Sequence, residues 1–259
     1  CEGLKIVYYP YTNILYIILI FIITISFTND LGFNSTIKTT TIIFPILLVS
    51  ILLLFIGNLD NFSFQKIFPI LGGGFKNTFV LGLSNIGTFS GILYMYFLPP
   101  LLKEPDKYKK ICILSIILST LFVFICVATL LFMFSIYIST DEIMPLFSVS
   151  KYIEFGNFFQ RFEALFFLIW TISFCCYLSI SLKLSTYIFA KLYTLSDASQ
   201  MISIFSIIIF AIALLPSSYY ISHFFETYIY RILSISIMFI GLFILFLACT
   251  KKRMVKKFE

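Results

Sequence analysis

The chain has 259 residues, of which 60% are hydrophobic and only 12% are charged, and its mean hydropathy is +1.04. This composition excludes a soluble domain built around one buried core and is typical of proteins that cross the membrane several times. The net charge of +6 does not by itself indicate nucleic-acid binding, because cytoplasmic lysines give membrane proteins the same basic balance.

The chain begins at Cys1, without an initiator methionine, and its first seven residues match neither a signal peptide nor a soluble domain. Two interpretations stay open: a fragment of a longer protein, and a mature lipoprotein, which also begins with cysteine. The fragment is favoured, because a lipid anchor adds little to a protein that already crosses the membrane many times.

Apolar stretches of roughly 20 residues, the length that crosses about 30 Å of hydrocarbon, follow one another along the chain. They predict seven transmembrane helices, at residues 13–28, 39–56, 79–98, 111–138, 164–182, 201–220 and 229–249. We therefore expect an all-α, polytopic transmembrane helix bundle that forms a single integral membrane domain over residues 1–259.

Lysine and arginine are distributed unequally between the loops on the two sides of this bundle. If every predicted span crosses, twelve of the eighteen basic residues lie on one side, including Lys38 and those of the tail 251–259. By the positive-inside rule this side, with the C-terminus, is cytoplasmic, and the loops that contain Asp60 and Asp141 are external. The basic balance then reflects topology and anionic lipid, and we expect no nucleic-acid partner.

The third predicted span is interrupted by Gly-Leu-Ser-Asn-Ile-Gly-Thr-Phe-Ser-Gly, residues 82–91. Glycine lets the backbone leave the helix, and four polar side chains lie at a depth where unpaired polar groups are costly. These are Ser84, Asn85, Thr88 and Ser90. Gly87 and Gly91 also form a Gly-x-x-x-Gly pair for close helix packing, but packing does not account for the polar residues. The interruption favours a small-ligand site.

Two further features fit a functional and a purely structural interpretation alike. The glycine run 72–74, just before the broken span, either gates access from outside or joins two helices. A polar stripe in the fifth predicted span consists of Ser173, Tyr177, Ser181 and Ser185, spaced four residues apart. This stripe either completes a site opposite the broken span or satisfies its hydroxyls on its own helix.

Residues for catalysis or metal binding are scarce. The single histidine, His223, lies in a predicted external loop, so a Ser/His/Asp triad or a two-histidine metal site lacks its parts. The cysteines of the spans form no Cys-x-x-Cys pair and are expected to pack as small apolar residues. We expect no enzyme activity, no cofactor and no metal.

Several blocks of the sequence resemble one known family. They are Phe-Pro-Ile-Leu-Gly-Gly-Gly at 68–74, Thr-Phe-Ser-Gly at 88–91, Phe-Leu-Pro at 97–99, and Phe-Gln-Arg-Phe-Glu-Ala-Leu-Phe at 159–166 with Trp170. The chain resembles the B subunit of the nutrient germinant receptors of endospores, the spore germination permeases. The resemblance covers nearly the whole chain and is most specific in the Arg161-Phe162-Glu163 block and in the proline, leucine and glycine block.

The resemblance implies an amino-acid-permease-like fold with an inverted five-helix repeat, of which seven of ten spans are present because the N-terminus is truncated. Residues 1–57 would hold the last two spans of the first repeat, 78–250 the second repeat, and 251–259 a basic cytoplasmic tail. In such permeases a ligand binds at the bilayer midplane between two broken helices, one from each repeat. The ligand-binding residues are then Gly87, Thr88, Phe89, Ser90 and Gly91, with Ser84 and Tyr177.

The implied function is that of a multi-pass protein of the spore inner membrane that binds a small nutrient, an amino acid or a sugar. It would signal to the A and C subunits of a receptor complex. Leu93 stands where many relatives are expected to carry an acidic residue. The absence of this ionisable group argues against proton-driven transport. An amino-acid secondary transporter working by alternating access stays the main alternative, and a scaffold that only holds partners is a third.

Overall fold

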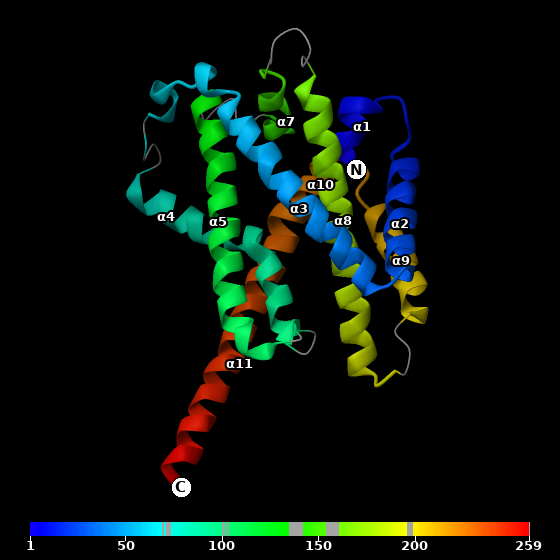
Figure 1. Ribbon diagram of the computed structural model, residues 1–259, viewed down its shortest axis with the longest axis vertical. Helices are drawn as coiled ribbons and strands as arrows, with labels where there is room; N and C mark the ends of the chain where they lie inside the picture. Colours follow the sequence, from blue (N-terminus) through cyan, green and yellow to red (C-terminus); the bar gives the residue numbers. More distant parts are fainter. Residues whose placement is uncertain are drawn as a thin grey trace. The chain divides into compact units, whose positions relative to one another are not determined.

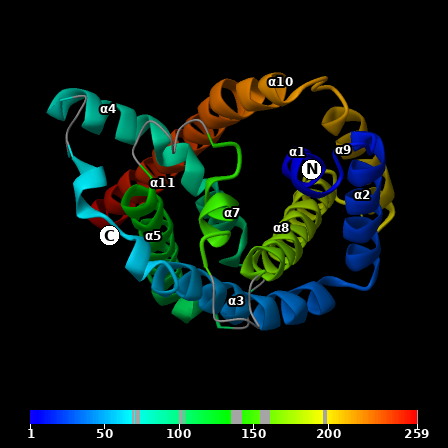
Figure 2. The ribbon, with the colours of Figure 1, turned by 90° about the horizontal axis from the view of Figure 1, so that it is seen from above.

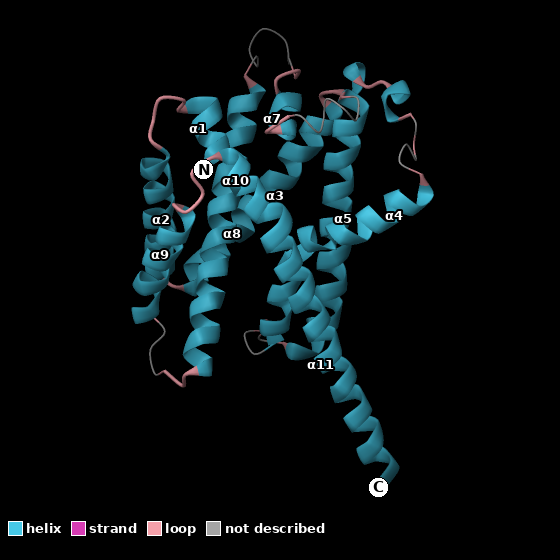
Figure 3. Cartoon of the chain, turned by 180° about the vertical axis from the view of Figure 1, so that it is seen from behind, coloured by secondary structure: helices cyan, strands magenta, loops and turns pink. Residues whose placement is uncertain are grey.

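A computed structural model of the protein describes residues 1–68, 70, 74–99, 102, 104–134, 142–153, 161–195 and 199–258. Every secondary-structure element in these residues is helical, and no strand occurs among them (Figure 3). The all-α prediction is therefore confirmed. Contacts divide the chain into two compact units, Cys1–Ile70 with Ile117–Leu215, and Leu71–Ile116 with Pro216–Glu259.

The first unit contains both long apolar helices and short helical turns. Its elements are α1 (Glu2–Tyr8), α2 (Ile14–Asp30), α3 (Phe33–Ile56), the 3₁₀ turns η1 (Leu59–Asn61) and η2 (Phe64–Ile67), most of α5 (Tyr108–Met133), α7 (Pro145–Ser150), α8 (Phe162–Leu192) and α9 (Gln200–Ala213). The second unit contains α4 (Phe75–Ser84), the 3₁₀-helical segment η3 (Asn85–Phe97), η5 (Pro105–Lys107), the first turns of α5, α10 (Tyr219–Phe224), the π-helical turn η6 (Phe225–Tyr230) and α11 (Arg231–Phe258).

Local signals in the sequence fix where several helices begin and end. Asn13 caps α2, since its side-chain oxygen accepts a hydrogen bond from the Leu15 amide at 3.1 Å. Gly32, at φ +95°, separates α2 from α3 with a backbone angle that other residues rarely adopt. Ser218 caps α10 through a 3.4 Å hydrogen bond from the Ile221 amide. These caps satisfy amides that a helix start leaves unpaired.

Two apolar clusters hold the first unit together. In one, α3, α5, α7 and α8 meet around Leu54, Val149 and Phe162, all at most 1% exposed. In the other, α2, α8 and α9 meet around Ile25, Leu182 and Ile202. Figure 1 shows α3 crossing α8 obliquely, and Figure 2 shows α2 and α9 side by side next to α8. Helix α8 is thus the central element of this unit.

The C-terminus of α5 is closed by the segment that follows α3. The Ser63 amide donates to the Phe132 carbonyl at 3.1 Å, and the Lys66 ammonium donates to the Met133 carbonyl at 2.7 Å. A cation at a helix C-terminus satisfies unpaired carbonyls and complements the helix dipole.

The helices agree with most of the predicted spans, but the count of seven stays a prediction. Among the described residues, four helices are long and apolar enough to cross a membrane: Asn34–Ile56, Tyr108–Met133, Phe162–Leu192 and Tyr219–Ile244. The spans predicted at 13–28 and 201–220 correspond to shorter apolar helices, Ile14–Asp30 and Met201–Ala213. The span predicted at 79–98 is divided between α4 and η3. For 111–138 the helix ends at Met133, before a bend at Phe134, and residues 135–141 lie outside the described part.

Large apolar side chains cover the outside of these helices. Ile20 is 62% exposed, Phe124 68% and Phe239 68%, although leaving such side chains in water is unfavourable. In a bilayer the same side chains contact lipid tails at no cost. This surface, with the four long apolar helices, identifies a multi-pass membrane protein.

Candidate functional site

The predicted interruption of the third span is present in the backbone. The α-helical pattern of α4 ends at Ser84, and Asn85–Phe97 continues as a 3₁₀ helix with a non-helical residue, Phe89, at φ −86° and ψ 24°. Long 3₁₀ segments are uncommon because their hydrogen bonds are poorly aligned, and inside a helix they often mark a hinge or a functional site. The change of helix type falls inside the segment 82–91.

The space around this interruption is open at the two positions where it is described. A Cβ atom added at Gly82 or at Gly91 would meet no other atom within 4 Å. The Phe89 ring is partly exposed. The side chains of Ser84, Thr88 and Ser90, and the surroundings of Gly87, lie outside the described part, so their role in a site stays a prediction.

The glycine run before the interruption is only partly described. Pro69 and residues 71–73 lie outside the described residues. Gly74 has φ +79°, in the region that favours glycine, and its carbonyl accepts hydrogen bonds from both the amide and the hydroxyl of Thr78 at 3.0 Å. Gly74 therefore starts α4, and a gating role for the run stays a prediction.

The three serines of the stripe on α8 hydrogen-bond to their own helix. Ser173 donates to the Ile169 carbonyl, Ser181 to the Tyr177 carbonyl and Ser185 to the Ser181 carbonyl, each at 2.8 Å. These bonds support the structural interpretation for the three serines, since a hydroxyl bonded to the carbonyl four residues back is satisfied as a donor. Tyr177 is 41% exposed and belongs to the first unit, whereas segment 82–91 belongs to the second. A site shared by the two stays a prediction.

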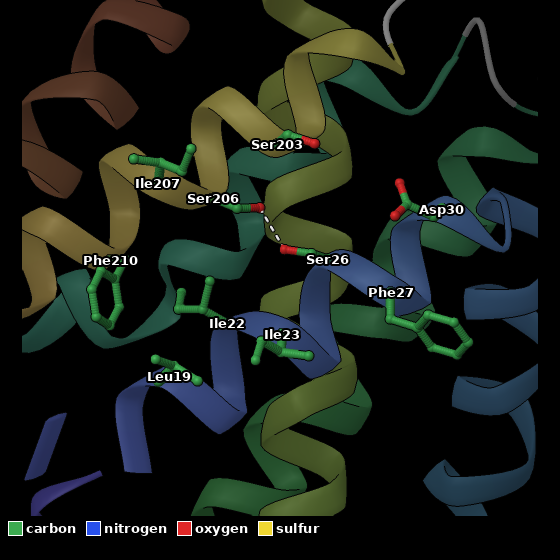
Figure 4. Close-up of a pocket in the computed structure, with 10 residues that line it drawn as sticks. All are labelled: Leu19, Ile22, Ile23, Ser26, Phe27, Asp30, Ser203, Ser206, Ile207 and Phe210. Carbon is green, nitrogen blue, oxygen red and sulfur yellow. Dashed lines mark hydrogen bonds between the residues drawn. The ribbon is translucent and has the colours of Figure 1, made fainter. Parts of the chain in front are cut away.

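A pocket of about 500 Å³ lies between α2 and α9, in a region where we identified no sequence motif (Figure 4). Its lining residues are Leu19, Ile22, Ile23, Ser26, Phe27, Asp30, Ser203, Ser206, Ile207 and Phe210. The Ser26 hydroxyl donates to Ser206 Oγ at 2.7 Å, and Ser206 donates to the Ile202 carbonyl at 2.7 Å. The pocket thus combines apolar walls with hydroxyls and one carboxylate, which suits an amphipathic ligand.

A buried amide lies beside this pocket on α2, three residues after Ser26. The Asn29 side chain is 1% exposed, and its nitrogen donates to the carbonyls of Ile25 at 2.9 Å and Ser179 at 3.1 Å. Its oxygen has no hydrogen-bond partner among the described residues, and neither has Oγ1 of buried Thr36. Asn29 therefore joins α2 to α8 by an interhelical hydrogen bond and leaves one acceptor unused.

The start of α8 lies in an aromatic cluster, within the block on which the family resemblance rests. Phe162 is 1% exposed, and Tyr8 contacts Phe167 with ring centroids 4.9 Å apart. Burial raises the pKa of Tyr8, the Glu163 carboxylate raises it further, and Arg161 opposes the shift. A smaller pocket of about 200 Å³ adjoins this cluster, between α7 and α8. The block is therefore mainly a packing feature of the first unit, and Phe159 and Gln160 lie outside the described residues.

Two observations concern potential metal ligands and the single histidine. No group of three His, Cys, Asp or Glu side chains that could hold a metal occurs among them. His223 stacks on Tyr219 at 6.2 Å, with Nε2 3.4 Å from the Thr227 hydroxyl, one helical turn away on either side. These contacts are those of a histidine that packs along its own helix.

Comparison with known proteins identifies the family to which the chain belongs. The model of a family described as "Spore germination protein" matches residues 2–221. The chain belongs to this spore germination family. The resemblance to the B subunits of germinant receptors is thereby confirmed.

A curated relative agrees with the family assignment. Spore germination protein B2 of Bacillus subtilis (strain 168) is 29% identical over 141 residues, which make up 54% of this chain and 38% of that protein. The match therefore spans well under half of the relative's length. No solved structure matches the chain. Family membership makes this a germination-related membrane protein. Its ligand, its partners and its orientation are proposed below.

Proposed function

We propose that the protein is the membrane subunit of a nutrient germinant receptor and binds a small nutrient, an amino acid or a sugar, at the break between Ser84 and Gly91. The observation that supports this proposal is the change from α to 3₁₀ helix at Ser84, with the kink at Phe89 and open space at Gly91. Where a membrane helix is broken, backbone groups are free to hold a polar ligand at bilayer depth.

Each residue type in the segment has a role in such a site. Gly87 and Gly91 leave the backbone accessible, the hydroxyls of Ser84, Thr88 and Ser90 supply donors and acceptors, and Phe89 forms an apolar wall or gate. The nutrient binds one arrangement of the helices more tightly than another and so shifts their populations. The A and C subunits of the receptor respond to this shift in populations. The complex lies in the spore inner membrane, and the C-terminus of this subunit lies in the cytoplasm.

A pair of matched glycine substitutions tests the site. Gly91→Leu places a side chain in open space next to the kink, whereas Gly82→Leu places the same side chain in equally open space on the regular α4 helix. In spores that carry the complete gene, we expect Gly91→Leu to raise the nutrient concentration for half-maximal germination by about tenfold or more. Gly82→Leu should leave it within about threefold of wild type.

Immunoblots of spore membranes check that both variants accumulate to wild-type levels. Normal nutrient sensitivity of Gly91→Leu, at wild-type levels, contradicts the proposed site. Equal losses in the two variants would show that the segment acts through helix packing alone.

The main alternative is a secondary transporter of the same fold, for which a broken helix is equally suitable. Leu93 favours sensing, because a proton-coupled carrier needs an ionisable group near the substrate. Uptake of radiolabelled nutrient into vesicles that contain the complete protein separates the two functions. Concentrative uptake that is lost in Gly91→Leu would favour the transporter.

A further inference from the structure

The pocket between α2 and α9 changes in character from one end to the other. The two helices run antiparallel along it, so that Asp30 and Ser203 lie towards one end and Leu19 and Phe210 towards the other (Figure 4). The bonded pair Ser26 and Ser206 lies between them. One end therefore offers charge and hydroxyl groups, and the other offers only hydrocarbon.

The polar groups at the charged end have no partners among the described residues. No ion pair or hydrogen bond between described residues involves the Asp30 carboxylate or the Ser203 hydroxyl, and both side chains are exposed. The inner hydroxyls are already used, because Ser26 donates to Ser206 and Ser206 to the Ile202 carbonyl. Asp30 lies just past the predicted span 13–28 and its side chain is exposed, so this carboxylate is free to accept charge-assisted hydrogen bonds from a cationic group.

The apolar walls are open along one side of the pocket. Ile23 is 58% exposed, Phe27 63% and Ile207 68%, so a ligand can enter laterally between the helices. The volume of about 500 Å³ lies within the range of roughly 300–1,000 Å³ that is common for small-molecule sites. Lateral access from the bilayer suits a lipid better than a nutrient that arrives from water.

We propose that this pocket binds a membrane lipid whose headgroup carries an ammonium ion, of which phosphatidylethanolamine is the test case. The lipid ammonium donates to the Asp30 carboxylate, and the Ser203 hydroxyl donates to a phosphate or ester oxygen. One acyl chain lies along Ile23, Phe27 and Ile207. The site is independent of the nutrient site proposed above, and its charge and shape would let lipid composition influence the α2 and α9 pair.

Lipid selectivity in native mass spectrometry tests this assignment. The intact protein is purified from membranes, delipidated, and titrated with phosphatidylethanolamine, phosphatidylglycerol and diacylglycerol of equal chain length. We expect phosphatidylethanolamine to bind with about tenfold preference, and Asp30→Asn to abolish the preference, because a hydrogen bond between charged groups is lost. Asp60→Asn, which removes an exposed carboxylate of η1, is the matched control and should keep the preference.

Placement of the lipid needs a second measurement. In proteoliposomes, phosphatidylethanolamine with a photoreactive acyl chain should label peptides of α2 and α9, and Ile207→Trp should reduce the labelling by filling the pocket. Equal binding of the three lipids to the wild type, or a preference that survives Asp30→Asn, overturns the proposal. Labelling elsewhere overturns it as well, and so does a cross-link between two protein copies through α2 and α9, which would assign the groove to a protein partner.

Discussion

Asn29 shows what a single polar side chain does inside an apolar bundle. Its amide nitrogen reaches the Ser179 carbonyl on α8 at 3.1 Å, and the side chain is almost fully buried. Neighbouring hydroxyls, such as that of Thr28, instead donate to a carbonyl of their own helix, here that of Thr24 at 2.7 Å. Only the first arrangement connects two helices.

Asn29→Ala should therefore lower the free energy of unfolding by about 1 kcal/mol, within the range found for interhelical hydrogen bonds in membranes. Thr28→Ala, one position away, removes a hydrogen bond within α2 and should change stability by less than half as much. Unfolding of the purified protein by dodecyl sulfate in mixed micelles measures both. Equal effects of the two substitutions would show that the link to Ser179 adds nothing.

At the scale of elements, η3 depends on its neighbour α11. A Cβ atom on Gly241 would lie 2.7 Å from Cζ and 2.8 Å from Oη of Tyr96, so the two elements pack closely at this point. The Tyr108 hydroxyl also donates to the Met95 carbonyl at 2.7 Å. Because a long 3₁₀ helix is weak by itself, contacts of this kind hold it in place.

Gly241→Leu should displace Tyr96 and destabilise the protein by roughly 1–3 kcal/mol, the usual cost of overpacking. Gly82→Leu is again the control, since its new side chain meets nothing within 4 Å. The second substitution Tyr96→Ala should restore part of the stability lost in Gly241→Leu. Thermal denaturation in detergent measures all three, and a Gly241→Leu protein as stable as the Gly82→Leu protein would argue against close packing of η3 on α11.

For the whole molecule, orientation in the membrane is the property that charge predicts most directly. Green fluorescent protein fused after residue 259 should fluoresce, because the basic tail is expected in the cytoplasm. Alkaline phosphatase fused within the loop that contains Asp60 should be active, because that loop is expected outside. The opposite pattern of the two reporters would show that the topology is inverted and that segment 82–91 has the opposite orientation in the bilayer.

The sequence predicted correctly the features that depend on the local backbone conformation. The glycines of segment 82–91 predicted a break, and the structure changes helix type at Ser84. Helix ends were less accurate: α8 runs from Phe162 to Leu192, well past the predicted end at 182, because Lys183 and Lys191 end the apolar stretch without ending the helix. Hydropathy reports the hydrocarbon thickness, whereas hydrogen bonding sets the length of the helix.

The sequence could not show which way polar side chains turn. The serines of the α8 stripe and Ser206 of α9 occur in equally apolar surroundings, yet the former bond to their own helix and the latter also accepts from Ser26 on α2. The difference arises from which helices are neighbours, which a single sequence does not contain. For the same reason the pocket at Asp30 had no sequence signal.

The hydrogen bonds of α2 have a mechanical consequence. Asn29 joins α2 to α8, and Ser26, three residues earlier on the same helix, joins it to α9. In hydrocarbon no water replaces a broken hydrogen bond, so the separation of either pair would carry its full cost. We therefore expect α2, α8 and α9 to move together as one rigid unit. Any rearrangement that accompanies signalling should then change the contacts of this unit with its surroundings and leave the contacts among the three helices unchanged.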